Sequence, residues 1–208
     1  MRRWILEFLV VGALLFVRTA SADGPAIVVL GDSLSSGYGL NGAASWVALL
    51  ERRLSDEGYE YDVVNASIAG DTSAGGLSRL PRLLELHKPE VVVIELGGND
   101  GLRGQPVGNL RRNLERMIEL TQAAGVRVLL TGIQIPPNYG PLYTRQFSDL
   151  YPELAARYGV PLVEFLMDGV ALNAHLMQND QMHPNADGQP LMLENVWPVL
   201  IDLLQAPT

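Results

Sequence analysis

The chain has 208 residues, with 23 acidic and 15 basic side chains, a formal net charge of −8 and no cysteine. So acidic a chain is a poor partner for nucleic acid, and the lack of cysteine excludes disulfide bonds and a thioether lipid anchor. The histidines, His87, His175 and His183, lie far apart in the sequence and do not have the spacing of a zinc site. We therefore expect no metal, no cofactor and no nucleic-acid partner.

The first 22 residues have the pattern of a secretory signal peptide. Arg2 and Arg3 form a basic start, residues 9–17 are apolar, and Ala20-Ser21-Ala22 is a small-residue cleavage site. The apolar run is shorter than the roughly 20 residues that a spanning helix needs, which favours cleavage over an uncleaved anchor. The remaining residues, 23–208, fit one domain. We expect that domain to be a monomer in the periplasm or secreted.

Five short apolar runs predict buried strands of a parallel sheet. They lie at residues 26–30, 61–65, 91–96, 126–133 and 161–163. The segments between them carry apolar residues at helical spacing, and a last helix is expected over 186–204. This alternation predicts an α/β fold. The expected architecture is a three-layer α/β/α flavodoxin-like sandwich with five parallel strands in the order 2-1-3-4-5.

Three residues with catalytic potential follow the first three predicted strands. Ser33 comes directly after the first strand, and Gly70 and Asn99 lie in the loops after the second and third. Because strand 1 lies between strands 2 and 3 in the predicted order, these residues should converge at the carboxyl edge of the sheet. A glycine N–H and an asparagine amide at that edge are suitable donors to a developing oxyanion.

Near the other end of the chain, Asp180 and His183 are three residues apart. A serine nucleophile needs a histidine to take its proton and a carboxylate to orient that histidine, so Ser33, Asp180 and His183 supply a complete set. Taken singly, each has a structural alternative. Ser33 could be a helix N-cap, Asn99 could form an Asx-turn, and an Asp-x-x-His pair is more often a surface pair.

Together these motifs resemble those of the GDSL, or SGNH, hydrolases, named for a Ser, Gly, Asn and His that here are Ser33, Gly70, Asn99 and His183. The segments 31–40, 94–104, 135–143 and 177–190 are most similar to a branch of bacterial periplasmic thioesterases, arylesterases and lysophospholipases, and the similarity covers nearly all of the chain after residue 25. Small departures, such as Ser36 and Gln181 where alanine and glycine are usual, concern substrate detail rather than chemistry.

The resemblance implies a serine hydrolase that works through an acyl-enzyme. The catalytic triad would be Ser33, Asp180 and His183, and the oxyanion hole would be formed by Ser33, Gly70 and Asn99. The implied substrate is a small acyl ester, a thioester or a lysophospholipid. No Gly-x-Ser-x-Gly elbow occurs in the chain, which excludes the α/β-hydrolase fold as the host of this triad.

An apolar stretch at 135–143 is the candidate wall for an acyl chain. Its candidate substrate-binding residues are Ile135, Pro136, Pro137, Tyr139, Leu142 and Tyr143. Such a wall favours acyl esters over a carbohydrate O-deacetylase on the same fold, which would need a shallow polar site. A non-catalytic binding module is a third possibility, but such a module has no need for the complete set of catalytic and oxyanion residues.

The segment 37–42 also fits the Gly-x-Gly-x-x-Gly fingerprint of dinucleotide-binding proteins. Its glycines begin six residues after Gly31 rather than at the end of the strand, and Asp62 lies at the start of the second strand instead of its carboxyl end. The helix and the acidic residue would therefore miss the pyrophosphate and the ribose. We interpret this segment as a loop beside Ser33.

Overall fold

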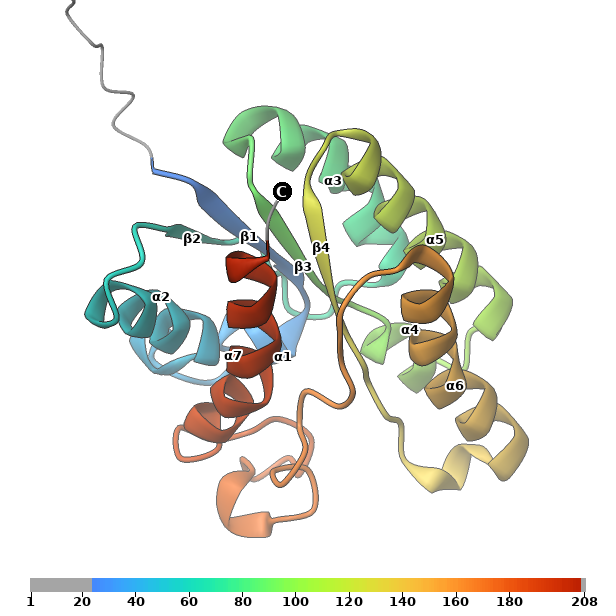
Figure 1. Cartoon of the computed structure of the whole chain (residues 1–208). Coiled ribbons are helices and arrows are strands. Elements are labelled where there is room, and N and C mark those ends of the chain that lie inside the picture. Colours follow the sequence, from blue (N-terminus) through green and yellow to red (C-terminus); the bar gives the residue numbers. More distant parts are fainter. Residues whose placement is uncertain (1–23, 207–208) are drawn as a thin grey trace, which may run out of the picture.

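The computed structural model describes residues 24–206, so the predicted leader at 1–22 lies outside the described residues. Five parallel strands form one sheet in the order β2-β1-β3-β4-β5, which confirms the predicted topology (Figure 1). The strands are β1 (Ala26–Gly31), β2 (Asp62–Asn65), β3 (Val91–Glu95), β4 (Arg127–Thr131) and β5 (Leu162–Val163).

Helices connect the strands and cover the sheet. The α-helices are α1 (Ser33–Ser36), α2 (Trp46–Asp56), α3 (Ser73–His87), α4 (Gly98–Leu102), α5 (Val107–Ala123), α6 (Pro141–Tyr158) and α7 (Gln189–Gln205). Short 3-10 turns are η1 (Gly42–Ala44), η2 (Pro137–Tyr139) and η3 (Ala174–Leu176). Among residues 24–206, no helix combines the length and the apolar character needed to cross a membrane.

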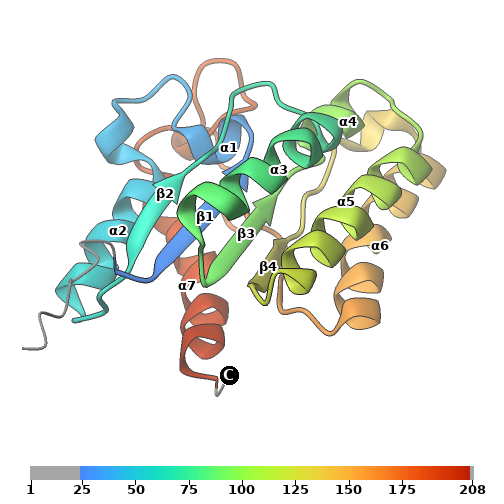
Figure 2. The ribbon, with the colours of Figure 1, turned by 90° about the horizontal axis from the view of Figure 1, so that it is seen from above.

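The helices form two layers, with α3, α5 and α6 on one face of the sheet and α2 and α7 on the other (Figure 2). Successive residues of β1 belong to opposite cores, because side chains alternate along a strand. Val28 and Leu30 pack toward α3, α5 and α6, whereas Ile27 and Val29 pack toward α2 and α7. All four side chains are fully buried, as expected for a strand of a sheet covered on both faces.

The last helix starts later than the sequence predicted. It begins at Gln189 rather than at residue 186. The Oδ1 atom of Asn185 accepts hydrogen bonds from the backbone N–H groups of Asp187 (3.0 Å) and Gly188 (3.3 Å), so an Asx-turn precedes the helix. The fourth strand is likewise shorter than predicted, since β4 ends at Thr131.

The register of the central strands brings the carboxyl ends of β1, β2 and β3 to one edge. Gly31 at the end of β1 pairs with Glu95 at the end of β3, and Val29 pairs with Asn65 at the end of β2. The chain after β2 continues along β1, because the N–H of Ile68 donates to the carbonyl of Gly31 at 3.0 Å. The loops that follow these strands therefore start side by side.

Two buried carboxyl groups lie beneath this edge. Glu95 is 0% exposed, and its Oε2 accepts hydrogen bonds from the N–H of Asp32 (3.1 Å) and the hydroxyl of Ser35 (2.7 Å). Burial raises the pKa of Asp32 to about 6. Burial, together with the nearby charge of Asp32, raises the pKa of Glu95 well above its usual value. Folding therefore favours the protonated form of Glu95 relative to the unfolded chain.

Replacing Glu95 with Gln should make stability less dependent on pH. A carboxyl group with a raised folded pKa contributes stability below its unfolded pKa, here near 4.5, and loses that contribution as the pH rises through the folded pKa. Glu95→Gln keeps the shape and stays neutral, so its melting temperature should fall less than that of the wild type between pH 5 and pH 9. Thermal unfolding followed by circular dichroism measures both slopes.

The control is Glu85→Gln, which changes an exposed carboxyl group on α3. Its melting temperature should follow the wild-type slope. Equal slopes for wild type and Glu95→Gln would show that Glu95 does not carry the raised pKa.

Candidate active site

Ser33 lies in a turn that is fixed on both sides by buried groups. It is the first residue of α1, and the preceding residue, Asp32, is the N-cap of that helix. The Oδ1 of Asp32 accepts a hydrogen bond from the N–H of Leu34 at 3.0 Å, while Glu95 binds the backbone of Asp32 from below. Because β1 and this cap are buried, the half-buried Ser33 hydroxyl is presented at the edge of the sheet in a defined position.

Asp180 and His183 lie at the tip of a small hairpin, residues 177–185, which follows η3. Met177 and Pro184 form an isolated antiparallel bridge, and the N–H of Gln178 donates to the carbonyl of His183 at 2.7 Å. At the tip, the Oδ1 of Asp180 accepts hydrogen bonds from the N–H groups of Met182 and His183, both at 3.0 Å. Asp180 thus shapes the turn that carries His183.

The structure joins Ser33, His183 and Asp180 in one chain of hydrogen bonds. His183 Nδ1 lies 2.7 Å from Asp180 Oδ2, and His183 Nε2 lies 2.9 Å from Ser33 Oγ. Because an ionised carboxylate only accepts, Nδ1 carries the proton and Nε2 is left to accept the proton of the serine hydroxyl. The side chain of His183 is 15% exposed and that of Asp180 is 43% exposed, so solvent reaches this end of the chain.

Asp180 is held in its charged form. The hydrogen bond from the imidazole of His183, followed by those from the backbone of His183 and Met182, lowers the pKa of Asp180 to about 2. The carboxylate is therefore negative at all pH values near neutrality. A fixed negative charge beside Nδ1 favours the tautomer described above and stabilises a positively charged imidazole.

Asn99 is the second residue of α4, which follows β3 after two intervening residues, and its side chain reaches the serine turn. Its Nδ2 donates a hydrogen bond of 2.9 Å to Asp32 Oδ2. An asparagine amide has two N–H groups, so one remains for another acceptor. Asp32 uses its two oxygens for Leu34 and Asn99, and this fixes which end of the Asn99 amide points toward the turn.

Gly70 lies in the exposed loop after β2, where its φ of +80° favours glycine. A Cβ at this position would meet no protein atom within 4 Å, so among the described residues the backbone angle is the constraint on this position. The Nη2 of Arg103 donates to the carbonyl of Gly70 at 2.9 Å, which links this loop to the end of α4.

The predicted acyl-chain residues at 135–143 do not share one orientation. Ile135 is buried in the core, and Pro136, Pro137 and Leu142 are exposed, Leu142 at 71%. The half-buried Tyr139 and Tyr143 are tied to the backbone, because their hydroxyl groups donate to the carbonyls of Leu102 (2.8 Å) and Gln105 (2.6 Å). A hollow of about 370 Å³ borders Ile135 at the start of α6.

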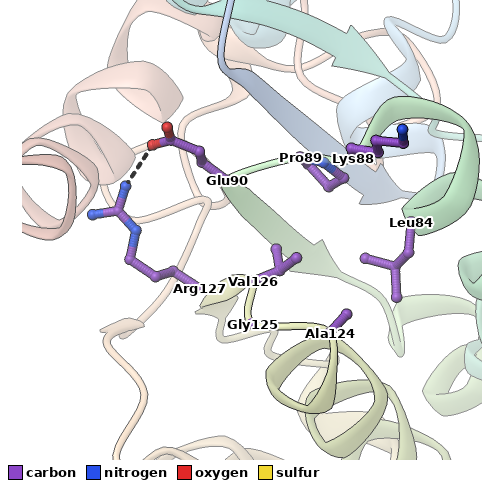
Figure 3. Close-up of a pocket in the computed structure, with 8 residues that line it drawn as sticks. All are labelled: Leu84, Lys88, Pro89, Glu90, Ala124, Gly125, Val126 and Arg127. Carbon is purple, nitrogen blue, oxygen red and sulfur yellow. Dashed lines mark hydrogen bonds and ion pairs between the residues drawn. The ribbon is translucent and has the colours of Figure 1, made fainter. Parts of the chain in front are cut away.

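A second hollow, of about 550 Å³, lies at the opposite edge of the sheet (Figure 3). Leu84 and Val126 line it, and an ion pair of 3.0 Å between Arg127 and Glu90 lies at one side. Glu90 and Arg127 stand at the amino ends of β3 and β4, whereas Ser33 follows the carboxyl end of β1. This hollow is therefore separate from the serine site.

Other residues of the site were not found by the sequence motifs. Arg79 on α3 pairs with Asp71 at 2.9 Å and donates to the carbonyls of Ala66 and Gly31, so it holds the Gly70 loop against the end of β1. Tyr38 lies against His183 with ring centroids 4.7 Å apart. No local pattern marks such long-range partners. In the part of the chain that the structure describes, no cluster of His, Cys, Asp or Glu could hold a metal ion.

Comparison with known proteins gives concordant results. A family model described as the GDSL-like Lipase/Acylhydrolase family matches residues 29–191. The chain is 53% identical over 190 residues to the esterase TesA of Pseudomonas aeruginosa, an alignment that covers 91% of this chain and 94% of that protein. It is 45% identical over 192 residues to thioesterase 1/protease 1/lysophospholipase L1 of Escherichia coli K12, covering 92% of this chain and 89% of the relative.

Among solved structures, one similar fold is that of the psychrotrophic esterase EstA from Pseudoalteromonas sp., inhibited by monoethylphosphonate. Its TM-score is 0.84 and its sequence identity 40%, over 88% of this chain and 100% of that chain. The family match covers most of the chain, including the second half of β1, the turn with Ser33 that follows it, the Asn99 turn and the hairpin with Asp180 and His183. This chain therefore belongs to the GDSL-like lipase/acylhydrolase family.

Proposed function

We propose that this protein hydrolyses acyl esters and thioesters through an acyl-enzyme formed on Ser33. The observation that carries the proposal is the hydrogen-bonded chain from Asp180 through His183 to Ser33, with distances of 2.7 and 2.9 Å. Membership of the family and the names of the relatives, an esterase and a thioesterase/lysophospholipase, support the same chemistry.

In the proposed reaction, His183 Nε2 takes the proton of Ser33 as Oγ attacks the carbonyl carbon of the substrate. The tetrahedral intermediate then breaks its bond to the leaving alcohol or thiol, which receives the proton from His183. Water attacks the acyl-enzyme with His183 again acting as base, and the acid product leaves as Ser33 regains its proton. Asp180 remains ionised throughout and stabilises the positively charged imidazole.

The oxyanion of the intermediate would be met by the N–H of Ser33, the N–H of Gly70 and the Nδ2 of Asn99. The N–H of Ser33 belongs to the first turn of α1, where backbone N–H groups have no partner within the helix. Asn99 is oriented before substrate binds, because Asp32 accepts one of its N–H groups at 2.9 Å. Donors that are already oriented need no reorganisation during the reaction.

We further propose that the acyl chain binds along 135–143, where Pro136, Pro137 and Leu142 offer exposed apolar surface. Small acyl esters, thioesters and lysophospholipids are the proposed substrates. The signal-peptide pattern of residues 1–22 supports export to the periplasm or the medium. In this proposal, residues 23–208 are one hydrolase domain that acts as a monomer and needs no cofactor.

Ser33→Ala should abolish ester hydrolysis and leave the fold intact, because it removes only the hydroxyl that forms the acyl-enzyme. The measurement is the hydrolysis of p-nitrophenyl butyrate by the mature protein. An organophosphonate probe should label Ser33 in the wild type, as peptide mass mapping would show. Ser36→Ala is the matched control and should keep its activity. Wild-type turnover by Ser33→Ala would refute the proposal.

Asn99→Ala should lower kcat by about 10²-fold and change KM little, because an oxyanion donor acts mainly in the transition state. Steady-state kinetics with a short acyl ester measure both constants. The control is Asn113→Ala, which removes an asparagine amide away from Ser33. Asn113 lies on α5, and its Nδ2 donates to the hydroxyl of Ser73 on α3. A change confined to KM would assign Asn99 to substrate binding instead.

Leu142→Ser should reduce kcat/KM for long acyl chains and spare acetyl and butyryl esters. Each methylene removed from water is worth about 0.8 kcal/mol, so loss of a few contacts should lower the long-chain rate by roughly tenfold. Leu142 is preferable to Tyr139 for this test because Tyr139 also anchors the loop through its hydroxyl. A series of p-nitrophenyl esters from acetyl to palmitoyl measures the chain-length profile.

An equal loss for all chain lengths would place the acyl groove elsewhere. Leu86→Ser provides the control, since Leu86 is an exposed leucine on α3. Faster cleavage of acetylated sugars than of any simple acyl ester would favour a carbohydrate deacetylase.

A further inference from the structure

The hairpin 177–185 must be held against the sheet if His183 is to remain within reach of Ser33. Its body is irregular, and its tip with Asp180, Gln181 and Met182 is exposed. Ser33, by contrast, is fixed by the buried end of β1. In the described residues, two hydrogen bonds join this hairpin to the segment 33–42: the one from His183 to Ser33, and one made by Gln178.

Gln178 forms hydrogen bonds both to the segment 33–42 and within the hairpin 177–185. Its Nε2 donates to the carbonyl of Tyr38 (2.9 Å), in the loop that follows α1, and to the carbonyl of Pro184 (3.0 Å), the residue after His183. Its backbone N–H donates to the carbonyl of His183 at 2.7 Å. One side chain therefore connects the loop that follows the serine helix α1 with the hairpin that carries His183.

The amide of Gln178 can take only one orientation here. Two carbonyl oxygens face the same end of the amide, so this end must be the NH₂ group, and both of its N–H groups are used. A glutamate would put a carboxylate oxygen against two carbonyl oxygens. A methionine of similar length would leave both carbonyls without this donor.

Gly39 makes room for this contact. Its φ is +73°, and a Cβ at this position would overlap the Oε1 of Gln178. Any side chain at position 39 would push the Gln178 amide away from Tyr38. Next to this glycine, the ring of Tyr38 packs on the imidazole of His183 with 4.7 Å between centroids, so Gln178 also holds the loop that supports His183 from the side.

From these contacts we infer that Gln178 is a positioning residue for His183, linking the hairpin 177–185 to the loop at Tyr38 so that Nε2 stays within hydrogen-bond distance of Ser33 Oγ. This inference rests on the proposed serine hydrolase function. Gln178 acts through His183 and has no role in bond breaking. Its loss should lower the rate of the chemical step, because small displacements of a base from its nucleophile are costly.

The test is Gln178→Met in the mature protein. With p-nitrophenyl butyrate, kcat should fall about 10- to 100-fold while KM changes less than about threefold. The melting temperature should stay close to that of the wild type, because the side chain is only half-buried. Gln122→Met is the matched control: Gln122 also donates from Nε2 to a backbone carbonyl, that of Tyr158, between α5 and α6.

A double-mutant comparison separates positioning from a general structural role. In a His183→Ala background, adding Gln178→Met should leave the residual hydrolysis unchanged, since there is no imidazole left to position. Gly39→Ala places a Cβ against the Oε1 of Gln178 and so displaces the same amide. It should lower kcat in the wild-type background and have no further effect in His183→Ala.

The outcomes are distinct. If Gln178→Met keeps the wild-type kcat, or lowers the residual rate of His183→Ala by the same factor as in the wild type, Gln178 is not a positioning residue for His183. If His183→Ala itself retains wild-type kcat, the proposed function fails whatever the result for Gln178.

Discussion

The hydrogen bond between Ser33 Oγ and His183 Nε2 joins residues 150 positions apart, and the rest of the site is arranged around it. Its two ends are built differently. Ser33 follows a fully buried strand and is fixed by a capped turn, so its position is set by the packing of the whole sheet. His183 lies on a short hairpin with little core of its own and depends on a few directed hydrogen bonds. The geometry of the pair is therefore only as well defined as the contacts between the hairpin and the sheet edge.

The carboxyl groups near this bond are separated in function by their surroundings. Asp180 is largely exposed and accepts three hydrogen bonds, which lower its pKa to about 2 and make it a permanent charge beside the imidazole. Asp32 is 2% exposed, and burial raises its pKa to about 6 even though it accepts hydrogen bonds from Leu34 and Asn99. Glu95 is more deeply buried still and lies behind Asp32. Carboxyl groups thus supply a negative charge at the surface, on Asp180, and hydrogen-bond acceptors beneath the serine turn, on Asp32 and Glu95.

The features that follow from local chemistry could be predicted from the sequence. The Val- and Ile-rich runs of β1 and β3 are buried on both faces, so their composition alone marks them as central strands, and Ser33 and Asn99 follow from the ends of those strands. The predicted start of α7 was wrong because Asn185 forms a turn where the pattern still reads as helix. The tyrosines of 135–143 look like an apolar wall in the sequence, but their hydroxyl groups find backbone carbonyls across the fold. Gln178 lies in the similar segment 177–190, but the resemblance assigns it no role, and its contacts with Tyr38 and Pro184 become visible only in the structure.

The segment 135–143, where we propose that the acyl chain binds, is anchored independently of the hairpin 177–185. Tyr139 and Tyr143 are tied to the carbonyls of Leu102 and Gln105, and a backbone carbonyl is available whatever side chain stands at those positions. The exposed Pro136, Pro137 and Leu142 are not part of these ties, so substitutions there can alter the surface offered to a substrate while the loop keeps its attachment. The hairpin 177–185 is held by a different set of contacts, through Gln178 and Tyr38. Since these two sets of contacts have no residue in common, the surface proposed to bind the acyl chain can change without loosening the bond between His183 and Ser33.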